Sequence, residues 1–170
     1  MNHECPPDFD LATYERIESG CRQIAKAKPL CLPCHRERNA ACEHFEKRLY
    51  GELIPGAIVE ARAFFWLGLP YPTPIVTKGG QFYDIEVRGY KVEIKPARPE
   101  WWCAENNRIP DIILVTGDKG PVSWLDKTQV KILYETSVAV GRQRKMRKEL
   151  AGPFKSLLDC PLSKQLSLLF

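Results

Sequence analysis

The fold of this 170-residue chain is decided by one stretch, Asp84-Ile85-Glu86-Val87-Arg88-Gly89-Tyr90-Lys91-Val92-Glu93-Ile94-Lys95. Apolar and polar residues alternate on both sides of Arg88-Gly89, which is the period of half-buried strands. The glycine supplies the turn between them. The stretch therefore predicts a β-hairpin with apolar side chains on one face and charged side chains on the other.

The register of this hairpin places Asp84 opposite Glu93, whether the loop holds two residues or four. Arg88 suits the positive φ of a tight two-residue turn poorly, so a four-residue loop is at least as compatible with the sequence. Facing carboxylates destabilise a strand pair by up to about 1 kcal/mol. A divalent cation such as Mg²⁺ or Mn²⁺ offsets this repulsion, because hard cations are held by carboxylate oxygens.

Lys95 completes the pattern, because it lies two residues beyond Glu93 and therefore on the same strand face. An ammonium group there can orient an attacking water or stabilise the charge that gathers on a phosphoryl group. We interpret Asp84, Glu93 and Lys95 as a metal-dependent active site. The alternative is a solvated charged face, with Glu86 and Lys91 as an ordinary cross-strand pair.

The sequence of residues 79–95 resembles the core of the PD-(D/E)xK nuclease superfamily, whose restriction-endonuclease-like fold is shared by archaeal Holliday-junction resolvases. That superfamily carries one acid on the second core strand and an acid-x-lysine on the third, and Asp84, Glu93 and Lys95 match those positions. A further acid often comes from the helix before the sheet, where Glu60 matches.

One position departs from the pattern of the superfamily, since Tyr83 stands where proline usually precedes the motif acid. The resemblance covers residues 56–125 approximately. It implies an α/β fold with a mixed central sheet flanked by helices, preceded by an N-terminal helical, cysteine-rich module. We therefore expect three parts: the cysteine-containing segment 1–54, a nuclease-like core 55–150 and a C-terminal tail 151–170.

The activity implied by this resemblance is Mg²⁺-dependent hydrolysis of DNA phosphodiester bonds by an endonuclease, in repair, recombination or the processing of mobile-element or phage DNA. Many enzymes of this fold act as dimers, so a homodimer is one expected state. Two alternatives stay open. In the first, the chain is a non-catalytic adaptor that links nucleic acid to the replication machinery. In the second, it is an RNA-cleaving enzyme of the same fold.

The composition is that of a soluble globular protein, and the formal net charge of +4 suits a polyanionic partner such as DNA. The chain has no long apolar run and no basic, apolar leader, so we expect a cytoplasmic, nucleoid-associated protein of bacterial or phage origin, with no membrane partner. The seven cysteines, an odd number, favour thiols or metal ligands over disulfides.

The cysteines gather in Cys31-Leu32-Pro33-Cys34-His35, which Cys42 and His44 follow. Two thiolates separated by two residues can bind one Zn²⁺ ion, and a tetrahedral site needs four ligands. We expect Cys31, Cys34 and Cys42 to be three of them, with Cys21, His35 or His44 as the fourth. An iron–sulfur cluster ranks below zinc, and a loop of reduced thiols is the alternative to both.

Hydrophobic periodicity and capping residues predict the remaining elements. Before the hairpin, these are an amphipathic helix over 8–27 that begins at Asp8 or Asp10, a short helix over 43–53, a break at Pro55-Gly56 followed by the helix that carries Glu60, and an edge-like strand over 74–77. After the hairpin, they are an irregular or briefly helical crossover over 96–102, a strand over 111–116 that is covered on both faces, a strand over 122–125, and a helix that Asp126 caps.

Two C-terminal features suggest partners. The first is a basic run, which we interpret either as solvated helix surface or as a contact to DNA phosphates; it comprises Arg142, Arg144, Lys145, Arg147 and Lys148. The second resembles the peptide by which bacterial polymerases and repair factors bind the replicative sliding clamp, and it comprises Gln165, Leu166, Ser167, Leu168, Leu169 and Phe170. The alternative for the second is an apolar tail packed on its own domain.

Overall fold

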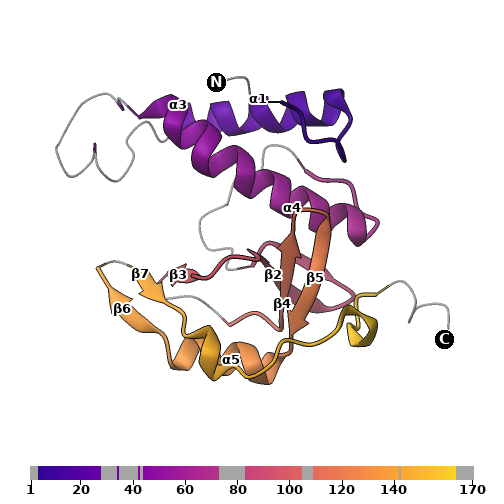
Figure 1. Ribbon diagram of the computed structural model, residues 1–170, viewed down its shortest axis with the longest axis vertical. Coiled ribbons are helices and arrows are strands. Elements are labelled where there is room, and N and C mark those ends of the chain that lie inside the picture. The colour runs from indigo at the N-terminus through magenta and orange to yellow at the C-terminus, as the bar shows by residue number, and fades with distance from the viewer. Residues whose placement is uncertain are drawn as a thin grey trace.

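The computed structural model describes residues 4–27, 34, 42, 44–72, 83–104, 109–141 and 143–163. Helices cover both faces of a central sheet, with α1, α3 and α4 on one side and α5 on the other (Figure 1). The predicted α/β class with a mixed sheet flanked by helices is confirmed at this level. None of the helices within these ranges is long and apolar enough to cross a bilayer.

The central sheet has the strand order β1-β2-β4-β5 and comprises β1 (Ile85–Val87), β2 (Tyr90–Pro96), β4 (Ile112–Gly117) and β5 (Gly120–Leu125). Only the β2–β4 pair is parallel, and the other two pairs are antiparallel. The first five residues of β4 are buried, as the apolar run predicts for a strand covered on both faces. Its alternate side chains enter two different apolar clusters.

The predicted hairpin is confirmed in its register, which pairs Ile85 with Val92 and Glu86 with Lys91. Its loop has two residues, and both have positive φ, 51° for Arg88 and 80° for Gly89. The Arg88 guanidinium donates a hydrogen bond of 3.2 Å to the carbonyl oxygen of Pro161. This tertiary contact favours the left-handed conformation that arginine adopts rarely on its own.

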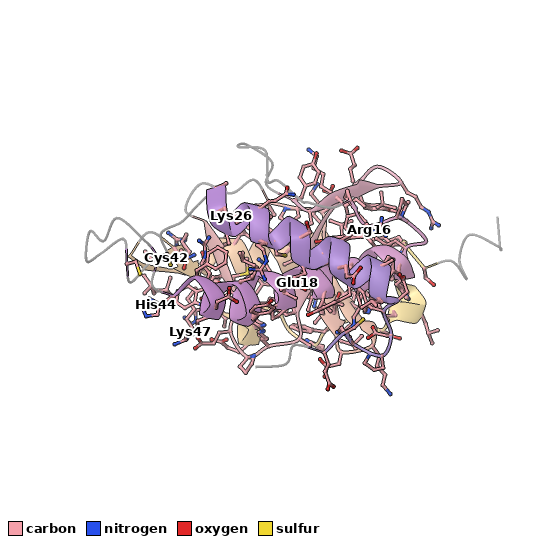
Figure 2. All side chains as sticks on the ribbon, turned by 90° about the horizontal axis from the view of Figure 1, so that it is seen from above. Arg16, Glu18, Lys26, Cys42, His44 and Lys47 are labelled. Atoms are coloured by element: carbon pink, nitrogen blue, oxygen red, sulfur yellow. The ribbon has the colours of Figure 1, made fainter. Side chains whose placement is uncertain are left out.

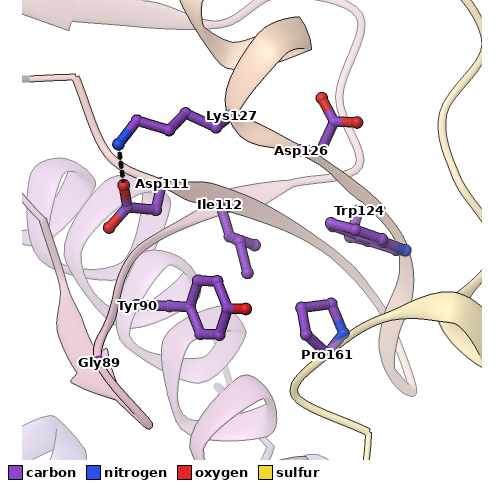
Figure 3. Close-up of a pocket in the computed structure, with 8 residues that line it drawn as sticks. All are labelled: Gly89, Tyr90, Asp111, Ile112, Trp124, Asp126, Lys127 and Pro161. Carbon is purple, nitrogen blue, oxygen red and sulfur yellow. Dashed lines mark hydrogen bonds and ion pairs between the residues drawn. The ribbon is translucent and has the colours of Figure 1, made fainter.

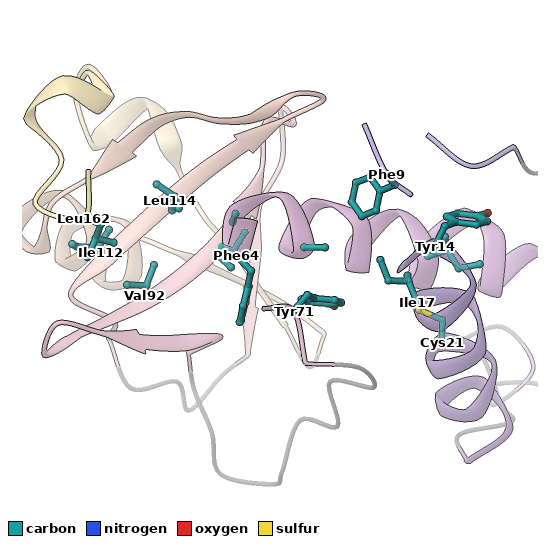
Figure 4. Close-up of a cluster of buried hydrophobic side chains, with 14 of the residues drawn as sticks. Phe9, Tyr14, Ile17, Cys21, Phe64, Tyr71, Val92, Ile112, Leu114 and Leu162 are labelled. Carbon is teal, nitrogen blue, oxygen red and sulfur yellow. The ribbon is translucent and has the colours of Figure 1, made fainter. Parts of the chain in front are cut away.

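The N-terminal helix α1 (Leu11–Ala27) begins where predicted, because Asp10 accepts a 2.8 Å hydrogen bond from the backbone N–H of Thr13. Its buried face includes Tyr14, Ile17 and Cys21, which lie against α4 with Phe9 (Figure 4). Leu11 is apolar, but as the first residue of the helix it is 62% exposed. The apolar cluster that includes α1 extends along one face of the sheet to Leu162.

A single helical run follows, built from α3 (Phe45–Arg48), a π-helical turn (Leu49–Leu53) and α4 (Ile54–Trp66). The predicted break at Pro55-Gly56 is wrong, because Leu53 and Ile54 keep helical dihedral angles. Proline lacks an N–H and clashes with the carbonyl four residues before it in a regular α-helix. The π turn just ahead of Pro55 has i→i+5 hydrogen bonds, such as Ile54 N to Leu49 O, which accommodate the proline.

A second sheet of three strands lies beside the first and has the order β3-β7-β6. It comprises β3 (Trp102–Ala104), β6 (Val138–Val140) and β7 (Gln143–Lys145). The predicted irregular crossover is confirmed over 97–101, and at Trp102 the chain enters β3, which lies between β2 and β4 in the sequence. The helical interpretation of the basic run is wrong, because β7 and a 3-10 turn (Lys148–Leu150) occupy this stretch. The β-branched residues of β6 favour a strand pair over helix continuation.

Helix α5 (Lys127–Glu135) packs on the other face of the sheet, with Val130 and Leu133 fully buried. Asp126 caps it as predicted: its carboxylate accepts from Gln129 N at 3.0 Å, and the Gln129 side chain accepts from Asp126 N at 3.3 Å. A 3-10 turn (Leu157–Asp159) contacts β5, and the described part of the chain ends at Ser163. The strand predicted over 74–77 lies outside the described residues.

Replacing Asp126 tests this cap. Asp126→Ala should lower the free energy of unfolding by about 1–2 kcal/mol, because the first turn of α5 loses its side-chain acceptor. Asp126→Asn keeps an acceptor and removes only the 2.7 Å ion pair with Lys155, which is partly exposed. Urea unfolding of both variants measures the difference. Equal destabilisation of the two would show that the ion pair, and not the cap, stabilises this helix.

Candidate active site

Asp84 lies at the open end of the hairpin, opposite its turn, and makes two hydrogen bonds to β2. Its backbone N–H donates to the Val92 carbonyl at 3.0 Å, and its carboxylate Oδ2 accepts from the Ile94 N–H at 2.6 Å. Asp84 precedes the first residue of β1, so its side chain, and not a strand backbone, accepts the hydrogen bond from the Ile94 N–H. This bond turns the carboxylate toward β2, where the acid-x-lysine lies.

Glu93 and Lys95 form an ion pair along β2, with 2.8 Å between Glu93 Oε1 and Lys95 Nζ. Their side chains are only 14% and 15% exposed, so both charges are largely removed from water. Lys95 Nζ also donates to the Trp102 carbonyl on β3 at 3.2 Å. The ammonium is therefore positioned by both sheets.

Glu60 reaches the same site from the middle of α4. The pKa of its carboxyl is raised to about 7, chiefly by burial and also by the negative charge of Glu93, while the hydrogen bond from Tyr71 and the charge of Lys95 act in the opposite direction. That hydrogen bond runs from Tyr71 Oη to Glu60 Oε2 at 3.0 Å. A glutamate at the edge of an apolar helix face could also face the solvent. The structure instead directs Glu60 toward Tyr71 and the other acids.

The electrostatics of Asp84 place it in the same group. Burial raises the pKa of Asp84 well above its ordinary value, and the charges of Glu93 and Glu60 raise it further. The Ile94 N–H and Lys95 lower the pKa of this carboxyl. Charges interact this strongly only at short range in a poorly hydrated site. Thus the structure brings together all four residues that the sequence nominated.

The arrangement leaves three carboxylates beside one ammonium, so the group carries excess negative charge once all members are ionised. Such a site attracts a divalent cation, for which carboxylate oxygens are suitable ligands. Within the ranges that the structure describes, no three His, Cys, Asp or Glu side chains are arranged to hold a metal ion. Glu93 is directed at Lys95, Glu60 at Tyr71 and Asp84 at a backbone N–H, so an arriving cation must compete with these partners.

Tyr71 is the site residue that sequence reasoning missed. It is 9% exposed, packs edge-on against Phe64 with 5.4 Å between ring centroids, and follows α4 by a short turn. Burial and the neighbouring Glu60 raise the pKa of its phenol, so Tyr71 stays protonated and donates. Its proline-rich surroundings in the sequence carry no pattern that indicates a site.

Of the residues predicted as zinc ligands, Cys21 lies in the apolar core and Cys34 lies beside His44. Cys21 is 5% exposed in the apolar cluster between α1 and α4, where burial and the charge of Glu60 raise the pKa of its thiol to about 11. Cys21, one of the three candidates for the fourth zinc ligand, therefore packs as a small core residue on the buried face of α1. Cys34 lies 3.3 Å from the Nδ1 of His44. Cys31 and His35 lie outside the described residues.

The basic run is largely tied to the protein. Arg144 donates to the Ser137 hydroxyl at 2.7 Å, and Lys145 pairs with Glu100. Lys148 bonds to the Arg98 carbonyl and lies 4.4 Å above the Trp101 ring, where burial lowers the pKa of its amine. Arg147 is paired with Glu149 at 3.1 Å. Arg142 and the clamp-like residues 165–170 lie outside the described residues.

A pocket of about 440 Å³ lies at the other end of the sheet, where β2 and β4 begin (Figure 3). Tyr90, Asp111, Trp124 and Lys127 line it. Asp111 there accepts from the Lys91 N–H at 3.0 Å and pairs with Lys127 at 2.8 Å, so this acid fastens β2, β4 and α5 together. The pocket includes none of the four grouped site residues.

Comparison of the chain with protein-family models, with curated proteins and with solved structures gives no match.

The raised pKa of Glu60 predicts a pH-dependent stability. The unfolded chain releases this proton near pH 4.5, whereas the folded protein holds it to about pH 7. In chelator, the free energy of unfolding should therefore fall as the pH rises through this window, because the unfolded state binds fewer protons there. Glu60→Gln should flatten the fall, as chemical denaturation at a series of pH values can measure.

Tyr71→Phe provides the matched variant. Loss of its hydrogen bond should raise the pKa of Glu60 further and extend the window of declining stability to higher pH. An unchanged profile in both variants would contradict the placement of Glu60 in the group.

Proposed function

We propose that this protein is a metal-dependent nuclease that hydrolyses DNA phosphodiester bonds at the site formed by Glu60, Asp84, Glu93 and Lys95. One observation carries the proposal: a carboxylate from helix α4, the carboxylate of Asp84 just before β1 and that of Glu93 on β2 share a largely dehydrated site with a lysine. The family resemblance of residues 79–95 assigns roles to the same four residues.

In this proposal Asp84 and Glu93 bind Mg²⁺ or Mn²⁺ with help from Glu60. The cation would polarise a phosphate oxygen and increase the acidity of a bound water. Lys95 positions the nucleophile or stabilises the charge that develops on the phosphate, and the Trp102 carbonyl keeps its ammonium in place. Tyr71 orients Glu60 and opposes the rise in its pKa.

The second sheet supplies a surface beside this site for a polyanionic substrate. Trp102 contacts Lys95 through its carbonyl and pairs with Lys145 across β3 and β7. Lys145 and Arg147 are 42% and 50% exposed, and each is paired with a glutamate that a DNA phosphate could displace. We therefore assign the phosphate contacts of the proposed enzyme to these two residues before Arg144 and Lys148.

Cleavage assays test the assignment directly. Asp84→Asn and Lys95→Met should each slow Mg²⁺-dependent cleavage of plasmid or branched DNA by at least about a hundredfold, since each removes a group that stabilises the transition state. Folding should persist, because asparagine still accepts a hydrogen bond from Ile94 N and methionine fills the aliphatic volume of lysine.

Glu86→Gln and Lys91→Met are the matched controls, because these side chains are exposed on the same hairpin. Both should cut at the parental rate, and chelator should stop all cleavage. Cleavage by the Asp84 or Lys95 variant at the parental rate would remove the active-site assignment. Cutting of RNA alone would support the RNA-cleaving alternative, and no cutting of either polymer with Mg²⁺ or Mn²⁺ would support the adaptor.

The sliding clamp remains a proposed partner on sequence grounds alone. A terminal peptide with Leu and Phe anchors can enter apolar pockets of a partner and become ordered on binding. Deletion of residues 165–170 should abolish co-elution with a bacterial sliding clamp in gel filtration while cleavage of naked DNA continues. Unchanged co-elution would exclude this peptide as the contact.

A further inference from the structure

Trp101 and Trp102 are adjacent in the sequence, but their side chains lie on opposite sides of the second sheet. Trp101 is 2% exposed, stacks on Phe154 with 5.6 Å between ring centroids, and donates from Nε1 to the Pro96 carbonyl at 2.7 Å. Trp102 is 36% exposed. Packing therefore accounts for the first tryptophan and leaves the exposed ring of the second unexplained.

Strand pairing places Trp102 on an exposed face that crosses all three strands of the second sheet. Lys145 on β7 pairs with Trp102 on one side and with Val138 on the other, and Gln143 pairs with Val140. Residues directly opposite each other share a face, as do residues two apart along one strand. We call the face formed by these five residues the outer face. Its valines are 52% and 50% exposed.

The opposite face of the same sheet packs on the protein. Cys103 is buried in the apolar cluster that α5 joins, and its partner on β7, Arg144, donates to the Ser137 hydroxyl at 2.7 Å. The second sheet lies at one edge of the molecule, so its outer face is presented to solvent (Figure 1). Contiguous apolar side chains on such a surface mark an interaction site.

The charges beside the outer face favour a polyanionic partner. The Lys145 ammonium lies 6.0 Å from the centroid of the Trp102 ring, and Arg147 follows two residues later. The acids paired with these two cations, Glu100 and Glu149, are themselves 54% and 65% exposed. Phosphates can therefore replace them without uncovering buried carboxylates.

The surface over α1 and α3 differs, because it mixes charges of both signs. Figure 2 shows Arg16, Glu18, Lys26 and Lys47 along these helices. Glu18 pairs there with Arg22 at 3.1 Å, and the buried face of α1 takes Tyr14 and other apolar side chains away from solvent. Exposed aromatic and aliphatic side chains combined with a cation distinguish the outer face from this surface.

The outer face begins at the candidate active site. The Trp102 carbonyl accepts from Lys95 Nζ at 3.2 Å, so the indole is attached to the backbone that positions this ammonium. Bases inside a continuous duplex are stacked on both sides. Only an unpaired or terminal base offers a ring face on which an aromatic side chain can stack.

We propose that the outer face binds an unpaired DNA strand, with Trp102 stacked on a base next to the scissile phosphate and Lys145 neutralising a phosphate of the same strand. The valines contact the apolar faces of the strand. This inference rests on the proposed nuclease function and assigns its substrate class: DNA that carries a single-stranded segment, such as a flap, a gap or a branch, in place of a continuous duplex.

Binding measured in chelator tests the proposal without any cleavage. A fluorescent single-stranded oligonucleotide and the duplex of the same sequence are compared by anisotropy. Trp102→Ala should weaken single-strand binding about tenfold, which is the loss of one base–aromatic stack, and leave duplex binding unchanged. Trp102→Phe should keep most of the affinity, because phenylalanine still offers a ring. Lys145→Met should weaken binding of both polymers and reduce its salt dependence.

Tyr90→Ala and Lys47→Met are the matched controls. Tyr90 is an aromatic residue of similar exposure, 38%, beside the hairpin turn, and Lys47 is an exposed lysine on α3. Both variants should bind the single strand with parental affinity. With Mg²⁺ or Mn²⁺, the parent should cut DNA with a single-stranded arm faster than continuous duplex, and Trp102→Ala should lose this preference.

Three results would overturn the proposal. The first is unchanged single-strand affinity in Trp102→Ala, and the second is an equal loss of affinity for single strand and duplex. The third is a parent dimer in analytical ultracentrifugation that Trp102→Ala dissociates, because a second copy of the chain would then cover the outer face.

The nuclease function can fail separately. Single-strand binding that depends on Trp102, without cleavage of any substrate, would support the outer face and contradict the nuclease. Cleavage that needs Asp84, with the parental substrate preference kept in Trp102→Ala, would support the nuclease and contradict the outer face.

Discussion

The partial burial of Glu60, Asp84 and Glu93 beside a single lysine is the constraint on which the rest of the structure depends. Like charges removed from water repel strongly, and the carboxyl groups of Glu60 and Asp84 therefore have raised pKa values. A fold that needed only packing would place apolar side chains at these positions. The protein instead gives each acid one partner: a phenol, a backbone N–H or the Lys95 ammonium.

The scaffold is arranged so that these acids meet. The parallel pairing of β2 with β4 places Glu93 and Lys95 in the interior of the sheet, and the antiparallel hairpin returns Asp84 to their side. Helix α4 packs on the sheet in the same apolar cluster as Val92, Ile94 and Leu114. This packing positions Glu60 of α4 beside Asp84 and Glu93. The small second sheet completes the surroundings through its contact with Lys95.

Much of this could be predicted from local sequence patterns, and the failures have physical causes. The hairpin register, the buried β4 and the Asp126 cap follow from alternation, apolar runs and capping chemistry, which act over a few residues. The continuous helix through Pro55 was missed because a proline normally breaks an α-helix. Here the hydrogen bonds ahead of Pro55 change from the i→i+4 to the i→i+5 pattern of a π turn, and the helix continues. Tyr71 was missed because only tertiary packing brings its hydroxyl to Glu60.

The most direct measurement of the central claim is an anomalous difference map from crystals soaked in Mn²⁺. The account predicts a manganese peak between the carboxylates of Asp84 and Glu93, within coordination distance of both, at a pH above the pKa of Glu60. A map in which manganese binds elsewhere, or in which Asp84 and Glu93 stay directed at Ile94 and Lys95 at saturating Mn²⁺, would contradict the account.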